Sequence, residues 1–193
     1  MKRETVKTAR RILEAAAQSF REKGLPAVSM REVAKKAGVT PMAIYRHYAD
    51  KATLVEAVVA HGFEEYERYV GAPPPDAEPL AALRHRAGRI FDFAVDHPVF
   101  FELMFLSPQA SREIVSAQRM RSIHAPTYKI AYEAVRSWRI GQRQVHPSNS
   151  VLTLSLLSYC IGFCAFHLNA TMNLSDSAAR EQYMIGLEAL LAP

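Results

Sequence analysis

The side chains with the most specific chemical use lie in one short segment that begins at Thr40. Arg46 is long enough to pair with O6 and N7 of guanine in a major groove. Its small or apolar neighbours allow close approach and can pack on thymine methyl groups, and the polar ones can bind phosphates, which sets register without reading sequence. These residue types predict contacts with double-stranded DNA. The candidate contacts in the segment are Thr40, Pro41, Met42, Ala43, Tyr45, Arg46, His47 and Lys51.

Two short helices joined by a tight turn must position this segment. Ser29 and Glu32 have the S-x-x-E spacing of a capping box and predict a short helix. Gly38 ends that helix. Thr40 can cap the next one, with Pro41 at its first position, where the missing N–H costs nothing.

The second helix of such a pair enters the major groove when the pair is a helix-turn-helix. Ile44 and Tyr48 are four residues apart and are expected to face the core. The spacing alone also fits two ordinary packed helices, in which Tyr45 and Tyr48 would be core aromatics and Arg46 a surface residue.

Charge is distributed unevenly along the chain. The first 51 residues carry twelve Lys or Arg against five Asp or Glu, whereas the remaining residues carry twelve against fourteen. A basic segment joined to a nearly neutral remainder is expected for a phosphate-binding module attached to a second domain. A solvated basic face would show the same counts.

The first 60 residues resemble the DNA-binding domain of the TetR family of bacterial regulators. The resemblance rests on ARRILEAAAQSFREKG, followed by VSMREVAKKAGVTPMAIYRHYADKATLVEAVV. It implies operator contacts from the segment above, helped by Ser29 and Arg31 of the preceding helix. The family pattern emphasises Tyr45 and His47, while a helical wheel directs Arg46 outward, toward a base, a phosphate or water.

Hydrophobic periodicity predicts an all-α protein of about nine to ten helices. A three-helix bundle with the helix-turn-helix would occupy residues 1–60, and a larger helical domain for ligand sensing and dimerisation would occupy residues 61–193. A Pro-rich connector follows Gly71. The helices expected beyond it cover residues 79–96, 98–106, 108–123, 126–139, 148–171 and 176–191, with a polar loop over 141–147.

The second domain is rich in aromatic residues, most of which are expected to form its core. A subset could line an apolar cavity with a few polar groups, the usual form of a small-molecule site. An apolar or aromatic effector would suit such a cavity. The candidate lining residues are Phe93, Phe101, Met104, Phe105, Tyr128, Tyr132, Tyr159 and Phe163.

The last two helices are the predicted dimer contacts. Residues 151–170 contain no Asp, Glu, Lys or Arg and are long enough to span a bilayer, but an interface helix explains their scattered polar residues better. A homodimer paired through these helices would bind an inverted-repeat operator. Cys160, Cys164 and His167 share a helix face, yet their spacing is not usual for zinc, and we expect neither a metal nor a cofactor.

The sequence therefore favours a ligand-responsive repressor that is released from its operator by a small molecule. No signal peptide is expected, which indicates the cytoplasm. A constitutive DNA binder and an activator remain open alternatives. An enzyme is not expected, because neither a catalytic triad order nor a Gly-rich phosphate loop is present, and Asp92 and Asp96 fit a helix surface.

Overall fold

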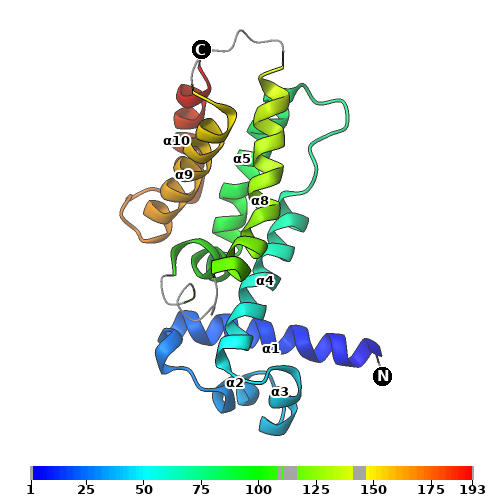
Figure 1. Cartoon of the computed structure of the whole chain (residues 1–193). Coiled ribbons are helices and arrows are strands. Elements are labelled where there is room, and N and C mark those ends of the chain that lie inside the picture. The colour runs from blue at the N-terminus through cyan, green and yellow to red at the C-terminus, as the bar shows by residue number, and fades with distance from the viewer. Residues whose placement is uncertain (1, 108–109, 111–116, 141–146, 193) are drawn as a thin grey trace. The chain divides into compact units, whose positions relative to one another are not determined.

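The computed structural model describes the chain except for residues 1, 108–109, 111–116, 141–146 and 193, and for the side chains of 2–6 and 117–126. Within the described residues the chain forms nine α-helices and no strand, which confirms the all-α prediction (Figure 1). The predicted helix over 108–123 and the predicted loop over 141–147 fall partly on residues outside this description.

The chain divides into two compact units. The first comprises Met1–Glu64 and Val99–Ile123, and the second comprises Glu65–Pro98 and His124–Pro193. The described residues of the 99–123 segment thus belong to the same unit as the N-terminal helices. The assignment of DNA binding to residues 1–60 and of sensing to residues 61–193 stays a prediction.

The first unit is built on the apolar face of α1 (Lys2–Lys23), which is followed by a 3-10 turn, η1 (Leu25–Ala27). Ile12, Ala16 and Phe20 of α1 are buried at the helical spacing that the sequence shows. The unit continues with α2 (Met30–Lys36), α3 (Pro41–His47), the start of α4 (Lys51–Val70), α6 (Pro98–Phe101) and the π-helix η2 (Glu102–Leu106).

The caps predicted for the two short helices are confirmed. The Ser29 hydroxyl oxygen accepts from the Glu32 amide at 3.3 Å, and Thr40 Oγ1 accepts from the Ala43 amide at 3.2 Å. Each bond satisfies one of the amides that a helix start leaves without a partner. Between the helices, Gly38 has φ +65°, a left-handed conformation that glycine adopts without a Cβ clash.

The second unit is built around α5 (Pro79–Asp96), which packs against α9 (Asn149–Leu168) and α10 (Asp176–Leu191). Tyr183 of α10 is fully buried, and its hydroxyl donates to the Ala87 carbonyl of α5 at 2.8 Å. Since a buried hydroxyl without a partner would be costly, this bond fixes α10 on α5.

One predicted break is wrong. We expected a helix to begin at Pro126, but α8 (Ala117–Trp138) runs through that residue. Proline removes one backbone donor and costs a helix about 3 kcal/mol, which tertiary packing can override. Thr127 and Val135 of α8 are buried, so this helix is held by its packing.

Gly38 provides a test of the turn. Replacing it with alanine forces a Cβ into the left-handed region and is expected to lower the free energy of unfolding by about 1–2 kcal/mol. Gly38→Asn should cost less, because asparagine tolerates this conformation. Urea unfolding followed by circular dichroism measures both. Equal stability of Gly38→Ala and the wild type would show that the turn does not need a positive φ.

Candidate DNA-binding surface and internal cavity

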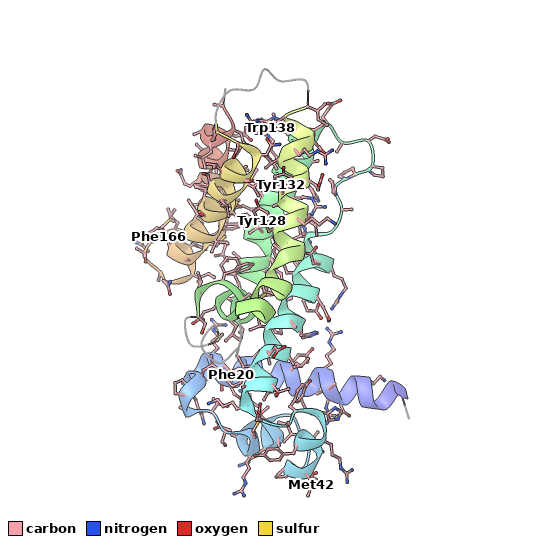
Figure 2. The ribbon with its side chains drawn as sticks, in the orientation of Figure 1. Phe20, Met42, Tyr128, Tyr132, Trp138 and Phe166 are labelled. Carbon is pink, nitrogen blue, oxygen red and sulfur yellow. The ribbon has the colours of Figure 1, made fainter. Side chains whose placement is uncertain are left out.

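Helix α3 has one buried side and one exposed side. Ile44 is fully buried, and Tyr48, just after the helix, is 9% exposed, which confirms that both face the core. Tyr45 is 49% exposed, so it is not a core aromatic, and Met42 is 67% exposed. Met42 points away from the rest of the first unit, at the free side of α3 (Figure 2).

The other candidate contacts of α3 lie on or beside this exposed side. Thr40, Pro41 and Arg46 are exposed, and Ala43 and His47 are half-buried. Because Thr40 Oγ1 accepts from its own helix, its hydroxyl hydrogen remains available to donate to a phosphate. The exposed side thus combines a cation, hydroxyls and apolar groups.

Three candidates come from outside α3. Ser29 and Arg31 are exposed at the start of α2. Lys51, at the start of α4, is half-buried, and its Nζ donates to the Pro26 carbonyl at 3.4 Å. That long bond positions the ammonium group and leaves it further donors.

The charges of α2 and α3 fall into two groups. Lys36 pairs with Glu22 at 2.7 Å, and Lys23 pairs with Glu32. Within the described part of the chain, Arg31, Lys35 and Arg46 form no ion pair.

Arg11 has a structural role behind this surface. Its guanidinium donates to the carbonyls of Ala37, at 3.0 Å, and Gly38, at 3.4 Å. It thereby caps the C-terminal end of α2, where backbone carbonyls lack helical partners. Fewer basic residues are therefore available to bind phosphates than the twelve Lys and Arg of the first 51 residues.

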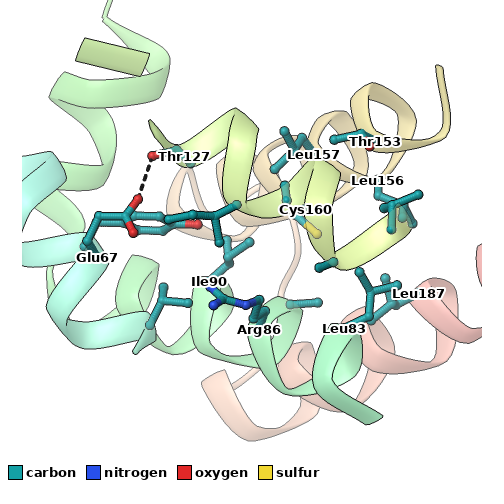
Figure 3. Close-up of a pocket in the computed structure, with 17 residues that line it drawn as sticks. Glu67, Leu83, Arg86, Ile90, Thr127, Thr153, Leu156, Leu157, Cys160 and Leu187 are labelled. Carbon is teal, nitrogen blue, oxygen red and sulfur yellow. Dashed lines mark hydrogen bonds between the residues drawn. The ribbon is translucent and has the colours of Figure 1, made fainter. Parts of the chain in front are cut away.

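The second unit contains a small cavity of about 50 Å³ (Figure 3). Aliphatic side chains from α4, α5, α8, α9 and α10 form most of its wall. Thr127 and Thr153 are two of its polar groups, and both are hydrogen-bonded, to Glu67 at 3.1 Å and to the Asn149 carbonyl at 2.7 Å. The remaining charged group in the wall is Arg86 of α5.

None of the eight aromatic and methionine residues predicted for the pocket lines this cavity. Phe101, Met104 and Phe105 belong to the first unit. Phe101 and Phe105 pack together with ring centroids 5.0 Å apart, and Met104 lies against Gly62. They pack within the first unit, away from this cavity.

The other five belong to the second unit and also pack on one another. Phe93 is fully buried against Tyr66, and the rings of Tyr128 and Tyr132 stack 6.2 Å apart. Tyr159 stacks on Tyr183 and donates to its carbonyl at 2.7 Å, with Phe163 6.0 Å away. Large flat side chains attract each other strongly, which leaves the gap to smaller aliphatic residues.

The residues that line the cavity differ from those that the sequence predicted. Glu67 and Arg86 are charged, and charged side chains are normally assigned to a helix surface. The only signal was positional: Arg86 lies between Leu83, Ala87 and Ile90 on a buried helix face. That spacing indicates that Arg86 lies on the apolar side of α5. It does not indicate which residues of other helices Arg86 faces.

Comparison with known proteins bears on both regions. The family described as "Bacterial regulatory proteins, tetR family" matches residues 12–58, a range that contains α2, α3 and the start of α4. The N-terminal part of the chain belongs to the TetR family.

Two curated relatives illustrate the extent of the match. The HTH-type transcriptional regulator TtgR of Pseudomonas putida is 32% identical over 93 residues, which cover 47% of this chain and 44% of the relative. The HTH-type transcriptional repressor KstR2 of Mycobacterium tuberculosis is 33% identical over 88 residues, 45% of this chain and 43% of the relative. The matched region thus spans less than half the length of these TetR-family relatives.

The fold extends the likeness to nearly the whole chain. A TetR-family regulatory protein from Rhodococcus RHA1 has a TM-score of 0.77 at 21% identity, covering 96% of this chain and 95% of its own. At this identity the likeness concerns the fold alone. The helical second unit thus shares its fold with that protein.

Both cysteines of the chain are buried in α9. Burial raises the pKa of Cys160 to about 11, and it raises the pKa of Cys164 further, since a thiolate is poorly solvated there. His167 Nε2 lies 2.7 Å from an Asp176 oxygen. No group of three metal-ligating side chains occurs among the described residues.

Helix α9 is also the only described helix that is long and apolar enough to cross a membrane. Length and composition carry little weight for a single helix, because interface helices share both properties. Thr153, Leu156, Cys160 and Cys164 form its buried side within the second unit.

The thiols give a direct test of this environment. At pH 8 both cysteines should react slowly with Ellman's reagent in the folded protein, because a thiol of pKa about 11 is about 0.1% thiolate there. The rate should rise about tenfold per pH unit, and unfolding in guanidinium should make both react at once. A Cys164→Ser variant assigns the signals. Fast reaction of either thiol in the folded protein would contradict the buried placement.

Proposed function

We propose that this TetR-family protein is a sequence-specific DNA-binding repressor that acts as a two-fold dimer. In this proposal a small-molecule effector releases it from an inverted-repeat operator. The observation that carries the proposal is the exposed side of α3, where Met42, Tyr45 and Arg46 stand free beside a fully buried Ile44. As a transcription factor it would work in the cytoplasm, where it has access to DNA.

The DNA-binding step uses α3 as the recognition helix. Its exposed side carries a guanidinium for base edges and apolar groups for thymine methyls. Thr40, His47 and Lys51, with Ser29 and Arg31 of α2, are suited to phosphates and would hold the helix in register. Pro41 and Ala43 present little bulk at the start of the helix and allow close approach.

The dimer forms through α9 and α10. Val151, Leu154 and Phe166 of α9 are 51%, 55% and 58% exposed, and Ile185 and Leu190 of α10 are 55% and 44% exposed. Phe166 projects outward from α9 (Figure 2). Exposed apolar side chains on two adjacent helices mark a surface that another copy can cover.

The register of α9 supports the same interface. Gly162 lies between Leu154 and Phe166 along the helix, and a Cβ built there would meet nothing within 4 Å. A small residue on an open apolar face allows two helices to approach closely. Two copies of α9 and α10 related by a two-fold axis would form a four-helix contact.

Release requires an effector that distinguishes two arrangements of the protein. A ligand with equal affinity for both arrangements shifts nothing, however tightly it binds. Helix α4 supplies Tyr66, Glu67 and Val70 to the cavity wall and, at its other end, follows the helix-turn-helix. We propose that α4 is the element whose position the effector changes.

The DNA-binding proposal is tested by selecting sites from randomised duplex DNA at near-physiological salt, since basic proteins bind any DNA at low salt. We expect an inverted repeat to be recovered. Recovery of no site above background, with and without extracts that could supply a co-ligand, would refute a sequence-specific regulator.

Arg46→Ala then separates three roles of this side chain. A base contact predicts a loss of about tenfold or more with relaxed specificity at one operator position. A phosphate contact predicts uniform weakening and a salt slope lower by about 1. Arg136→Ala, an equal charge change at an exposed site on α8, serves as the control. Unchanged operator affinity of the Arg46→Ala variant would show that the Arg46 side chain contacts solvent and not DNA.

The dimer is tested by placing a charge on its face. Leu154→Arg is expected to raise the dimer dissociation constant by about tenfold or more, because a charge would be buried without a partner. Sedimentation equilibrium measures the constant. Ile140→Arg changes an equally apolar residue, 74% exposed, outside α9 and α10, and should leave the dimer intact. Dissociation by the Ile140 variant alone would place the interface elsewhere.

A further inference from the structure

The cavity of the second unit lies beside a wider groove, and the two share part of their walls. The groove has a volume of about 510 Å³ and is lined by residues of α5 and α8 and by the chain before α5. Arg86, Ile130 and Ala134 line both the cavity and the groove. Arg86 therefore stands at the boundary between an apolar interior and solvent.

Arg86 has no hydrogen-bond or ion-pair partner within the described residues. Glu67, the other charged residue of the cavity, accepts from Thr127 Oγ1 at 3.1 Å. Figure 3 shows Arg86 rising from α5 near Leu83 and Ile90, among aliphatic side chains. A half-buried guanidinium without an anion retains a strong capacity to bind one.

The groove adds positive charge next to Arg86. Lys129 lines it, and so does Glu133, but the Glu133 carboxylate accepts from Arg136 at 3.1 Å. With that carboxylate paired to Arg136, Arg86 and Lys129 are the two charged groups of the groove lining that have no ion-pair partner among the described residues. This charge distribution favours an anion and disfavours a cation.

The sizes of the two spaces limit the shape of a ligand. A cavity of about 50 Å³ holds only a few carbon atoms unless its wall moves, whereas the groove holds a much larger group. The surface of the cavity is aliphatic over most of its extent, so it suits a hydrocarbon end. The polar end of the same molecule would remain at Arg86.

We propose that the effector is an anionic amphiphile, with its hydrocarbon end in the cavity and an oxyanion headgroup bound by Arg86 and Lys129. The proposal deepens the proposed function, because it assigns a chemical class to the effector. The planar fork of Arg86 fits a carboxylate or a phosphate in a bidentate pair. Entry of the ligand's hydrocarbon chain would separate α4, α5 and α8 around the cavity. In this way binding would change the position of α4.

Isothermal titration calorimetry without DNA tests the ligand class. The probes are decanoate, decyl phosphate, decanol and decylamine, which share one chain and differ in headgroup. We expect decanoate or decyl phosphate to bind at least tenfold more tightly than decanol, and decylamine to bind most weakly. The tighter of the two anions identifies the headgroup. Equal affinity for all four, or preference for decylamine, would overturn the proposal.

Three variants locate the site. Arg86→Gln is expected to weaken binding of the preferred anion about tenfold or more, the loss of a charge-assisted pair, while decanol binding stays within about twofold. Arg86→Lys should lie between, and Lys129→Gln should give a smaller loss. Lys35→Gln, an equal charge change on α2, is the control. If Arg86→Gln does not fold, the Arg86→Lys and Lys129→Gln variants decide, and unchanged anion affinity in both would overturn the proposal.

Operator binding is measured separately, on the sites recovered by selection. Anion binding that fails while operator binding succeeds would refute the effector class and leave the regulator. Failure of operator binding with anion binding intact would refute the regulator and leave the anion site. The two proposals can therefore fail independently.

Discussion

The exposed side of α3 depends on the burial of Ile44 on its opposite side. Helix α3 has seven residues, and a helix of that length is not stable alone in water. It persists because Ile44 is fully buried with Val33 and Leu54 in the core of the first unit, while Thr40 caps its start. An apolar anchor on one side is what leaves the other side free for contacts.

The second unit also depends on packing of large side chains. Its five helical segments surround the cavity. The aromatic side chains of Phe91, Tyr159, Phe163 and Tyr183 pack together, with Tyr159 and Tyr183 each donating a hydrogen bond to a backbone carbonyl. This rigid cluster supports α5, α9 and α10, and the aliphatic residues beside it border the cavity.

Charge has a different role in each unit. On α2 and α3, Arg31 and Arg46 are exposed. Water solvates their guanidinium groups there, so the absence of an ion-pair partner costs little free energy. Arg86 is half-buried among aliphatic side chains, where an unpaired charge costs more and an arriving anion gains more. The same residue type thus lies in water on one unit and in a partly apolar environment on the other.

The local features of the first unit could be read from the sequence because they depend on neighbours a few residues apart. The caps at Ser29 and Thr40, the turn at Gly38 and the core positions of Ile44 and Tyr48 all follow from spacing along the chain. The helix through Pro126 did not, since packing by later residues of α8 overrode a local signal.

What the sequence by itself determined about this protein is its helical class, its helix-turn-helix and the residue types on the exposed side of α3. What only the tertiary structure decided is the cavity and its wall. Apolar periodicity shows which side of a helix is buried, but it does not show which residues meet there. Phe93 and Arg86 lie on the same helix and both face inward, and only packing against Tyr66 made one a core residue and left the other beside a space.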